Sequence, residues 1–500
     1  MPIQLDTQLT PVRLRPKLER LFALSAGKIL DLERTWQPER GAPVFTVKGR
    51  YTARGWTEWT EGFQLGSALL QFDATGAARF LELGRCGTLA HMATHVSHTG
   101  VHDHGFNIVS THGNLWRLMR EGKVAASAAE RNFHELALKV SGAVQAARWT
   151  RLADGTGFIH SFNGPHSLFV DTVRSLRSLA IAHQLGHELR GEQDLRISLL
   201  GRLVQHALNT ARYSVYYGEG RDAWDVRGRT THEAIFNVTS GLFRCPSTQQ
   251  GWSPFTTWTR GLAWALLGFA EELEFLATLD QGALDDVASG LPWATIVPAG
   301  ERMDERMPGF TFTELCVRAA VATADFYLAS CCADGIPMWD TGAPNLHRLP
   351  DDYLERPAAP FNDWEPVDSS AAAIAAQGLW RLGNHLAAMA GPRRPAKLPG
   401  PAARVRGSLA GQGRRYRQAA LTIADTLFAE PYLAISPKHQ GLILHSVYHR
   451  PNGWDYVAPG QKVPNGESSM WGDYHARELA LVLLRAAQGA PYPTFFAPVG

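Results

Sequence analysis

The stretch DTVRSLRSLA, residues 171–180, places apolar side chains at the spacing of a single helix face. Its Val173, Leu176, Leu179 and Ala180 recur every three to four residues, which predicts an amphipathic helix. The same spacing returns near the end of the chain, at Leu479, Val482, Leu483 and Ala486. Alternation typical of strands is scarce between these two segments. We therefore expect an all-α protein.

Long polar segments rich in Trp, Gly, Asp and His separate the predicted helices. They cover residues 51–63, 97–106, 216–260, 334–370 and 436–474. Because they recur without a compositional break, residues 1–500 are expected to form one domain, a closed ring of helical hairpins. The loops at one rim of such a ring would form a binding site.

Two stretches are expected to be loop insertions outside the ring. Residues 280–310 contain several Gly and Pro. Residues 391–414 are basic and rich in Pro and Gly, a composition that predicts an exposed loop rather than a packed helix.

Composition excludes several classes of partner. Lys and Arg number 49 against 47 Asp and Glu, so a net charge of +2 provides no field for gathering nucleic acid. The first residues lack the apolar run of a secretory signal, and no segment approaches the length of a bilayer span. Five cysteines without Cys-x-x-Cys spacing favour reduced thiols. We expect a cytoplasmic protein without nucleic-acid or membrane partners, and its oligomeric state stays open.

A cluster of histidines at residues 91–104 is the strongest hint of a metal. His91 and His95 have a spacing that metal ligands can use, and so do His98 and His102. However, Gly100 interrupts the segment, and it lacks the acidic residue of a zinc-protease motif. Hydrogen-bonding or solvent-facing histidines are the favoured interpretation.

Four aspartates lie among aromatic residues: Asp103, Asp171, Asp368 and Asp473. Carboxylates beside Trp and Tyr are typical of carbohydrate sites, where a desolvated acid can stay protonated at neutral pH. Asp171 has a simpler alternative, because an Asp at the start of a helix often caps it.

Seven motifs in order give the chain a resemblance to a known family. They are WTEGF (59–63), HDHGF (102–106), Asp171-Thr172, WTRGLAWA (258–265), GIPMWD (335–340), DSSAAAI (368–374) and SMWGDY (469–474). With these motifs the chain resembles the unsaturated glucuronyl hydrolases of glycoside hydrolase family 88, which are related to the unsaturated rhamnogalacturonyl hydrolases.

The resemblance implies a six-hairpin α/α barrel that needs no metal or other cofactor. Its substrate would be an oligosaccharide ending in an unsaturated uronic acid, whose 4,5-double bond is hydrated so that the neighbouring sugar is released. Asp171 would protonate carbon 4 and then accept a proton from the water that attacks carbon 5. Asp103 would hold ring hydroxyls, and its negative charge would keep Asp171 protonated.

Several further residues are expected to contact the substrate. Trp56 and Trp59 could stack on a sugar face, and Arg260 could bind its carboxylate unless it forms an internal ion pair. The remaining candidates, taken from the motifs and the last loop, are His102, Gln249, Trp264, Ser369, His445, His449 and Ser469.

Three positions depart from the family pattern: Leu262 stands where Gln is common, Gln249 where His is common, and Ser175 where Asn is usual. Two alternatives therefore stay open. The barrel could hydrolyse an intact β-glucuronide or a related uronide, or it could bind sugars without catalysis.

Overall fold

A computed structural model describes residues 2–55, 58–292, 308–391 and 401–496. Within these ranges the chain forms two concentric layers of helices. The inner layer has six segments, each in contact with the next, and the last closes on the first. They are α2 (Glu61–Thr75), α5 (His104–Ile108) with a π-helical stretch (Val109–Gly113) and α6 (Asn114–Arg120), α8 (Thr172–Ser175) with α9 (Arg177–Gln184), α11 (Thr259–Leu276), α15 (Ser369–Met389) and α17 (Met470–Gln488).

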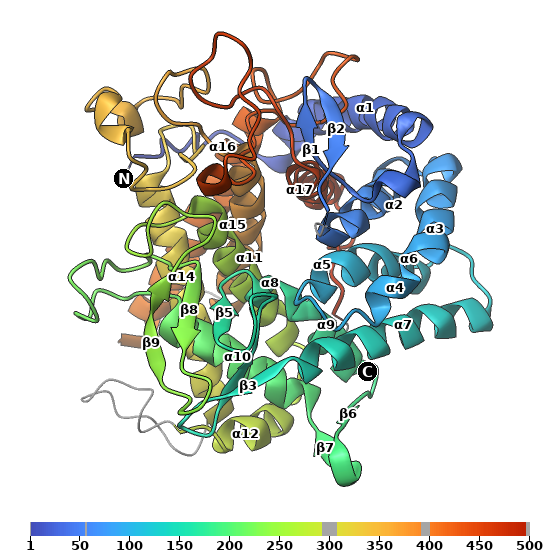
Figure 1. Ribbon diagram of the computed structural model, residues 1–500, viewed down its shortest axis with the longest axis vertical. Helices are drawn as coiled ribbons and strands as arrows, with labels where there is room; N and C mark the ends of the chain where they lie inside the picture. The colour runs from blue at the N-terminus through green and yellow to red at the C-terminus, as the bar shows by residue number, and fades with distance from the viewer. Residues whose placement is uncertain (1, 56–57, 293–307, 392–400, 497–500) are drawn as a thin grey trace.

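An outer layer covers these segments. Its helices are α1 (Pro11–Thr35), α3 (Ala78–His91), α7 (Ala128–Ala147), α10 (Leu199–Tyr213), α14 (Pro308–Ser330) and α16 (Pro401–Leu427), with the shorter α4 (Ala93–Val96) and α12 (Gln281–Ser289) beside them. The ring joins the two ends of the chain, because α17 packs against α1 and α2 (Figure 1). The all-helical ring predicted from the periodicity is therefore what the chain forms.

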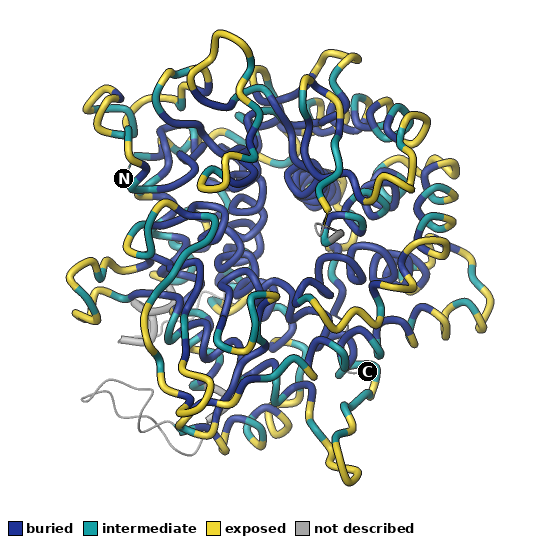
Figure 2. The backbone as a smooth tube through the Cα atoms, in the orientation of Figure 1, coloured by how far each residue is buried: buried dark blue, intermediate teal, exposed yellow. Residues whose placement is uncertain are grey.

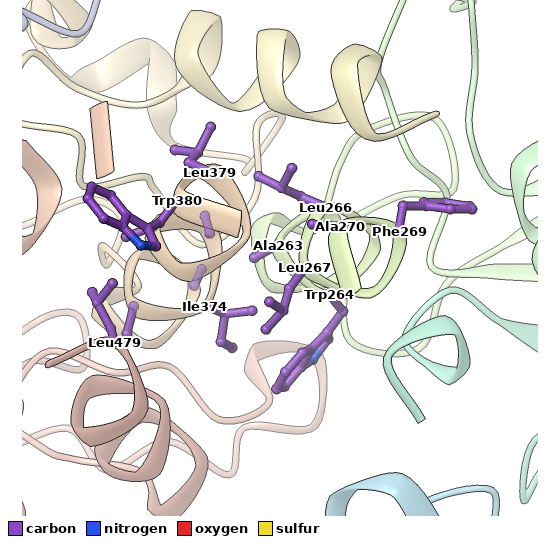
Figure 3. Packing of buried hydrophobic residues seen from close by; sticks show 14 of the residues in the cluster. Ala263, Trp264, Leu266, Leu267, Phe269, Ala270, Ile374, Leu379, Trp380 and Leu479 are labelled. Atoms are coloured by element: carbon purple, nitrogen blue, oxygen red, sulfur yellow. The ribbon is translucent and has the colours of Figure 1, made fainter. Parts of the chain in front are cut away.

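The inner helices are buried on all sides. In α11 nearly every residue is buried, and α15 begins with a long buried run of Ser and Ala. A helix enclosed by neighbours is expected to be largely apolar around its circumference, and the charged side chains that these helices do bury, such as Arg174 and Glu271, are paired with one another. Ala263, Leu267 and Ile374 interlock where α11 meets α15 (Figure 3). Exposed residues lie mainly in the loops and outer helices (Figure 2).

Short strands occur in the loops. They are β1 (Pro43–Val47), β2 (Arg50–Ala53), β3 (Trp149–Arg151), β4 (Gly157–Ile159), β5 (Ser167–Phe169), β6 (Leu189–Arg190), β7 (Arg196–Ile197), β8 (Glu233–Phe236) and β9 (Phe243–Ser247). Single 3-10 turns cover Pro38–Arg40, Glu58–Thr60, Glu192–Asp194, Leu346–Arg348, Tyr353–Glu355 and Arg450–Asn452. The antiparallel sheet β5–β8–β9 matters for the site, because β5 leads directly into α8.

The two predicted insertions are wrong in part. Residues 281–289 form α12, whose first turn is capped by the Asp280 side chain. Residues 401–414 belong to α16. Pro401 does not prevent this helix, because it stands at the first helical position, where proline is tolerated. Farther along, Gly413 lies where an added Cβ would be 2.8 Å from the Gly383 carbonyl oxygen of α15. The glycine that suggests a loop thus permits close helix packing, while residues 293–307 and 392–400 lie outside the described ranges.

Candidate active site

Asp171 lies at the junction between β5 and α8. The preceding Val170 donates its N–H to the carbonyl of His232, at 2.9 Å, which ties this junction to the start of β8. Asp171 immediately precedes α8, but its side chain accepts no capping hydrogen bond. The capping interpretation of this carboxylate is therefore wrong, and the carboxylate is available for chemistry.

A buried ion-pair network anchors the short helix α8. Arg174 lies 2.5 Å from Glu271 of α11 and 3.2 Å from Glu478 of α17, and its side chain is fully buried. Ion pairs in such surroundings are costly to break, because the remaining charge is left without a partner. This network fixes the helix that follows Asp171.

Asp103 reaches the same place through a close approach of two helices. It precedes α5, and Gly105 in the first turn donates its N–H to Ser175 Oγ of α8, at 2.7 Å. A Cβ atom on Gly105 would lie 2.4 Å from the Ser175 carbonyl oxygen, closer than real Cβ contacts. Glycine is therefore needed where the two aspartate-bearing helices meet.

His102 stands between the two aspartates. Its Nε2 atom lies 3.5 Å from Asp171 Oδ1 and 3.7 Å from Asp103 Oδ1. The ring is buried between Phe162 and Phe169, and among the described residues neither ring nitrogen has a hydrogen-bond partner within normal limits. One imidazole thus faces two carboxylates at distances that a small shift would convert into hydrogen bonds.

The electrostatics of this group differ from the sequence-based expectation. Burial raises the pKa of Asp171, but the adjacent His102 imidazole outweighs burial, and the pKa falls below its usual value. The pKa of Asp103 is raised, first by burial and also by the charge of Asp171. Burial lowers the pKa of His102, yet the two carboxylates raise it overall. The direction for Asp171 is thus opposite to the expectation that the charge of Asp103 keeps Asp171 protonated.

The two aspartates open into a pocket lined by loops and inner helices. Of the predicted site residues, eight line it: Trp59, His102, Asp103, Asp171, Gln249, Arg260, Trp264 and His449. Residues that sequence reasoning did not single out also line it: Phe106, Phe162, Phe169, Gln250, Trp258, Tyr448, Asn452 and Trp454. A narrow cleft with aromatic walls and two acids at its base suits a sugar ring.

Aromatic packing fixes part of this wall. Trp59 stacks on Trp471 with ring centroids 5.1 Å apart, and Trp264 packs against Phe106 at 5.0 Å. Trp59 is half-buried, so one part of its ring faces the pocket. Trp56, the other predicted stacking residue, lies outside the described residues.

Arg260 is buried and bound mainly to the protein itself. Its guanidinium donates to the carbonyls of Val447 and Tyr448 and to Gln250 Oε1, at 2.7 Å from the last, and it lies 3.4 Å from Asp368. The internal ion pair weighed as an alternative is thus present. Arg260 holds the last loop over the pocket, although it also lines the pocket.

Three predicted contact residues have structural partners instead. Ser469 caps α17, with its side chain accepting the N–H of Gly472. Ser369 donates its N–H to the carbonyl of His445, whose ring accepts the N–H of Gly466. Because Ser369, His445 and Ser469 do not line the pocket, their hydrogen bonds shape the loop rather than the pocket wall.

The histidine cluster does not converge on one point. His91 and His98 are exposed, His95 contacts Glu61 at 2.8 Å, and the ring of His104 pairs with Ser141 Oγ at 2.9 Å. Across the described ranges, no three His, Cys, Asp or Glu side chains are grouped so that they could hold a metal ion.

A larger cavity lies between α1, α2 and α3, away from both aspartates. Apolar side chains such as Leu32, Leu65 and Leu83 form much of its wall. The buried carboxylate of Asp473 accepts hydrogen bonds from the Tyr51 hydroxyl, at 2.7 Å, and from backbone N–H groups of the last loop. The hydrogen-bonding capacity of this buried carboxylate is therefore already used within the protein.

Comparisons with known proteins bear on this geometry. No family model matches the chain. The unsaturated glucuronyl hydrolase of Bacillus sp. (strain GL1) is 24% identical over 465 residues, covering 91% of this chain and 93% of that protein. A crystal structure of the Bacillus sp. GL1 enzyme superposes with a TM-score of 0.63 at 20% identity, covering 97% of this chain and all of that one. An unsaturated glucuronyl hydrolase specific for heparin gives 0.64 at 18% identity, covering 95% and 98%.

The chain has the fold of the unsaturated glucuronyl hydrolases. The resemblance and the α/α barrel predicted from the motifs are thereby confirmed.

The three departures from the unsaturated glucuronyl hydrolase pattern now have structural explanations. Leu262 is fully buried and does not line the pocket. Ser175 accepts the N–H of Gly105, so it joins helices rather than touching the pocket. Gln249 lies at the pocket, and its backbone N–H donates to His232 Nδ1 at 3.0 Å.

His232 is a residue that the sequence reasoning missed. It is buried next to the junction that holds Asp171, and its ring lies 4.5 Å from Phe169 and 4.7 Å from Trp258. Burial lowers its pKa to about 4, so the ring is neutral at neutral pH. No sequence motif around His232 indicates a role at the site. By contrast, Trp258 begins the WTRGLAWA motif, and Gln250 follows the candidate residue Gln249.

Proposed function

We propose that this protein is a glycoside hydrolase that hydrates the 4,5-double bond of a terminal unsaturated uronic acid and so releases the neighbouring sugar. The observation that carries the proposal is the pair of buried carboxylates, Asp103 and Asp171, at the base of an aromatic pocket on this barrel. Unsaturated glucuronyl hydrolases are also what the sequence relative and the structural neighbours are named.

The reaction needs one group that gives and then takes a proton. In the proposed mechanism the Asp171 carboxylic acid protonates carbon 4, and positive charge develops at carbon 5 beside the ring oxygen. A water then attacks carbon 5 and transfers a proton to the Asp171 carboxylate, which restores the acid. The hemiketal opens and the neighbouring sugar leaves. No redox agent takes part, because the net change is the addition of one water.

The chain's other pocket residues have supporting roles. Asp103 accepts hydrogen bonds from ring hydroxyls, while the half-buried Trp59 offers part of its ring to the sugar and the buried Trp264 supports the pocket wall. Arg260 holds the loop that carries Tyr448 and His449 at the pocket. A cytoplasmic location is part of the proposal and is supported by five cysteines that form no disulfide. No helix of the described ranges is apolar and long enough to cross a bilayer.

The test is incubation with lyase-generated unsaturated disaccharides while the ultraviolet absorbance of the double bond is followed. Hydration of the double bond removes this absorbance. Hydrolysis of an intact uronide causes no change in absorbance, because that substrate has no double bond. Loss of absorbance that requires Asp171 would support the proposal. Cleavage of a saturated β-glucuronide with the unsaturated substrate left unchanged would support the alternative, and binding without turnover of either would indicate a sugar-binding barrel.

A further inference from the structure

The proposed chemistry requires a protonated Asp171, whereas the neighbouring His102 lowers the pKa of this carboxyl. The question is where the proton resides before the substrate arrives. Of the described side chains, His102 is the one whose nitrogen faces both carboxylates, at 3.5 Å from Asp171 and 3.7 Å from Asp103. A proton on Nε2 would therefore be attracted by two negative charges at once.

Other charged and titratable groups also face His102, from the residue after α7, from the loop after β4, from α10 and from the residue before β8. They are Arg148, His160, His206 and His232. Burial lowers the pKa of His160 and His232 to about 4 and that of His206 to about 3. These three rings are neutral at neutral pH, and Arg148 keeps its charge throughout. Of these four imidazoles, His102 is thus the one that can hold a proton near neutral pH.

We infer that His102 stores, on Nε2, the proton that Asp171 delivers to carbon 4 of the substrate. This inference rests on the proposed function. In the free protein His102 is an imidazolium between two carboxylates. When the sugar enters, the proton moves across the 3.5 Å gap to Asp171 Oδ1, leaving a neutral imidazole and a carboxylic acid. After product release the proton returns to His102, so the cycle is balanced.

Desolvation provides the driving force for this transfer. The side chains of Asp103 and Asp171 are each 11% exposed in the unliganded pocket, whereas that of His102 is 2% exposed. A bound sugar covers the exposed carboxylate oxygens and expels their water. Removing water penalises an ion pair more than a neutral hydrogen-bonded pair, so the proton shifts from imidazole to carboxylate.

The pH profile of His102→Gln is the first test. Glutamine keeps a hydrogen-bonding side chain but cannot carry the proton, so the carboxylates alone must hold it. The basic limb of kcat/KM should then move to lower pH by about one unit or more, the scale on which a neighbouring charge shifts a carboxyl pKa. The matched control is His232→Gln, which removes a ring that is already neutral and should leave the limb in place. A His102→Gln rate that falls equally at every pH would refute the inference, since that result indicates packing alone.

The second test does not depend on turnover. Nitrogen NMR of the histidine-labelled wild-type protein reports the protonation of each ring, with His102 assigned by its absence from the His102→Gln spectrum. His102 should be an imidazolium at neutral pH and should become neutral when a saturated uronic-acid disaccharide is bound. A neutral His102 in the free protein would refute the inference whatever the substrate is. An imidazolium in a protein that leaves the double bond intact would instead refute the proposed function.

Discussion

Replacing Gly105 by alanine tests the contact that brings the two aspartates together. The new Cβ would lie 2.4 Å from the Ser175 carbonyl oxygen, where ordinary contact begins at 3.4 Å. Because the obstacle is backbone, α5 must retreat from α8 by about 1 Å, a misplacement that costs about 10²-fold in rate. The strain of overpacking should also lower the free energy of unfolding by about 1–3 kcal/mol.

The assay for Gly105→Ala is the rate of loss of double-bond absorbance, measured together with urea unfolding. We expect kcat to fall more than the affinity, because the loss is in alignment of Asp103 and His102 with Asp171. Gly27→Ala in α1 is the matched control, since a Cβ added at Gly27 would have nothing within 4 Å of it. That variant should keep wild-type activity and gain about 0.4–1 kcal/mol of stability. A Gly105→Ala protein with wild-type kcat and stability would show that the close approach is not required.

Four further outcomes are expected. Asp171→Asn should lower turnover by about 10²–10⁴-fold with folding and sugar binding intact; wild-type turnover would contradict its assigned role. Asp103→Asn should move the basic limb of the pH–rate profile to lower pH, because it removes a charge that raises the pKa of His102; a shift to higher pH would mean that the roles are wrong. Exhaustive chelation should leave turnover unchanged, whereas loss with recovery on adding zinc or manganese would revive a metal site at the histidine cluster. Asp73→Asn should destabilise the protein in urea by up to about 3–5 kcal/mol, because Arg117 and Arg485 lose a buried carboxylate and keep Glu121 as their remaining acidic partner.

The same Asp73 gives the acid dependence a definite sign. Burial raises the pKa of Asp73, but the charges of Arg117 and Arg485 lower it overall, well below the value of an unfolded Asp near 4. A depressed carboxyl pKa stabilises the folded state above the unfolded pKa, and this contribution is lost as the pH falls. Wild type should therefore lose stability below about pH 4 more steeply than Asp73→Asn. Parallel unfolding curves for the two proteins would contradict this assignment.

Parts of the fold were predictable from local sequence, and other parts were not. The helical segments at Val173–Ala180 and Leu479–Ala486 follow from periodicity, although the structure divides the first of them into α8 and α9 at Leu176. The start of α16 at Pro401 was missed, because Gly and Pro were interpreted as loop formers. Gly383 and Gly413 are instead used where α15 and α16 touch, and that contact joins residues that local sequence does not relate.

For the candidate site, the sequence alone determined which residues were candidates, and the tertiary structure decided which of them lie together at one pocket. The motif around Asp103 and the helix start at Asp171 were identifiable because their neighbours along the chain are characteristic. The sequence did not reveal three other features. These are the position of His102 between the two carboxylates, the hydrogen bond from Arg260 to the Tyr448 carbonyl, and the capping of α17 by Ser469. They depend on atoms brought together from distant parts of the ring. A pKa in particular is set by burial and by nearby charges, and both exist only once the ring has closed.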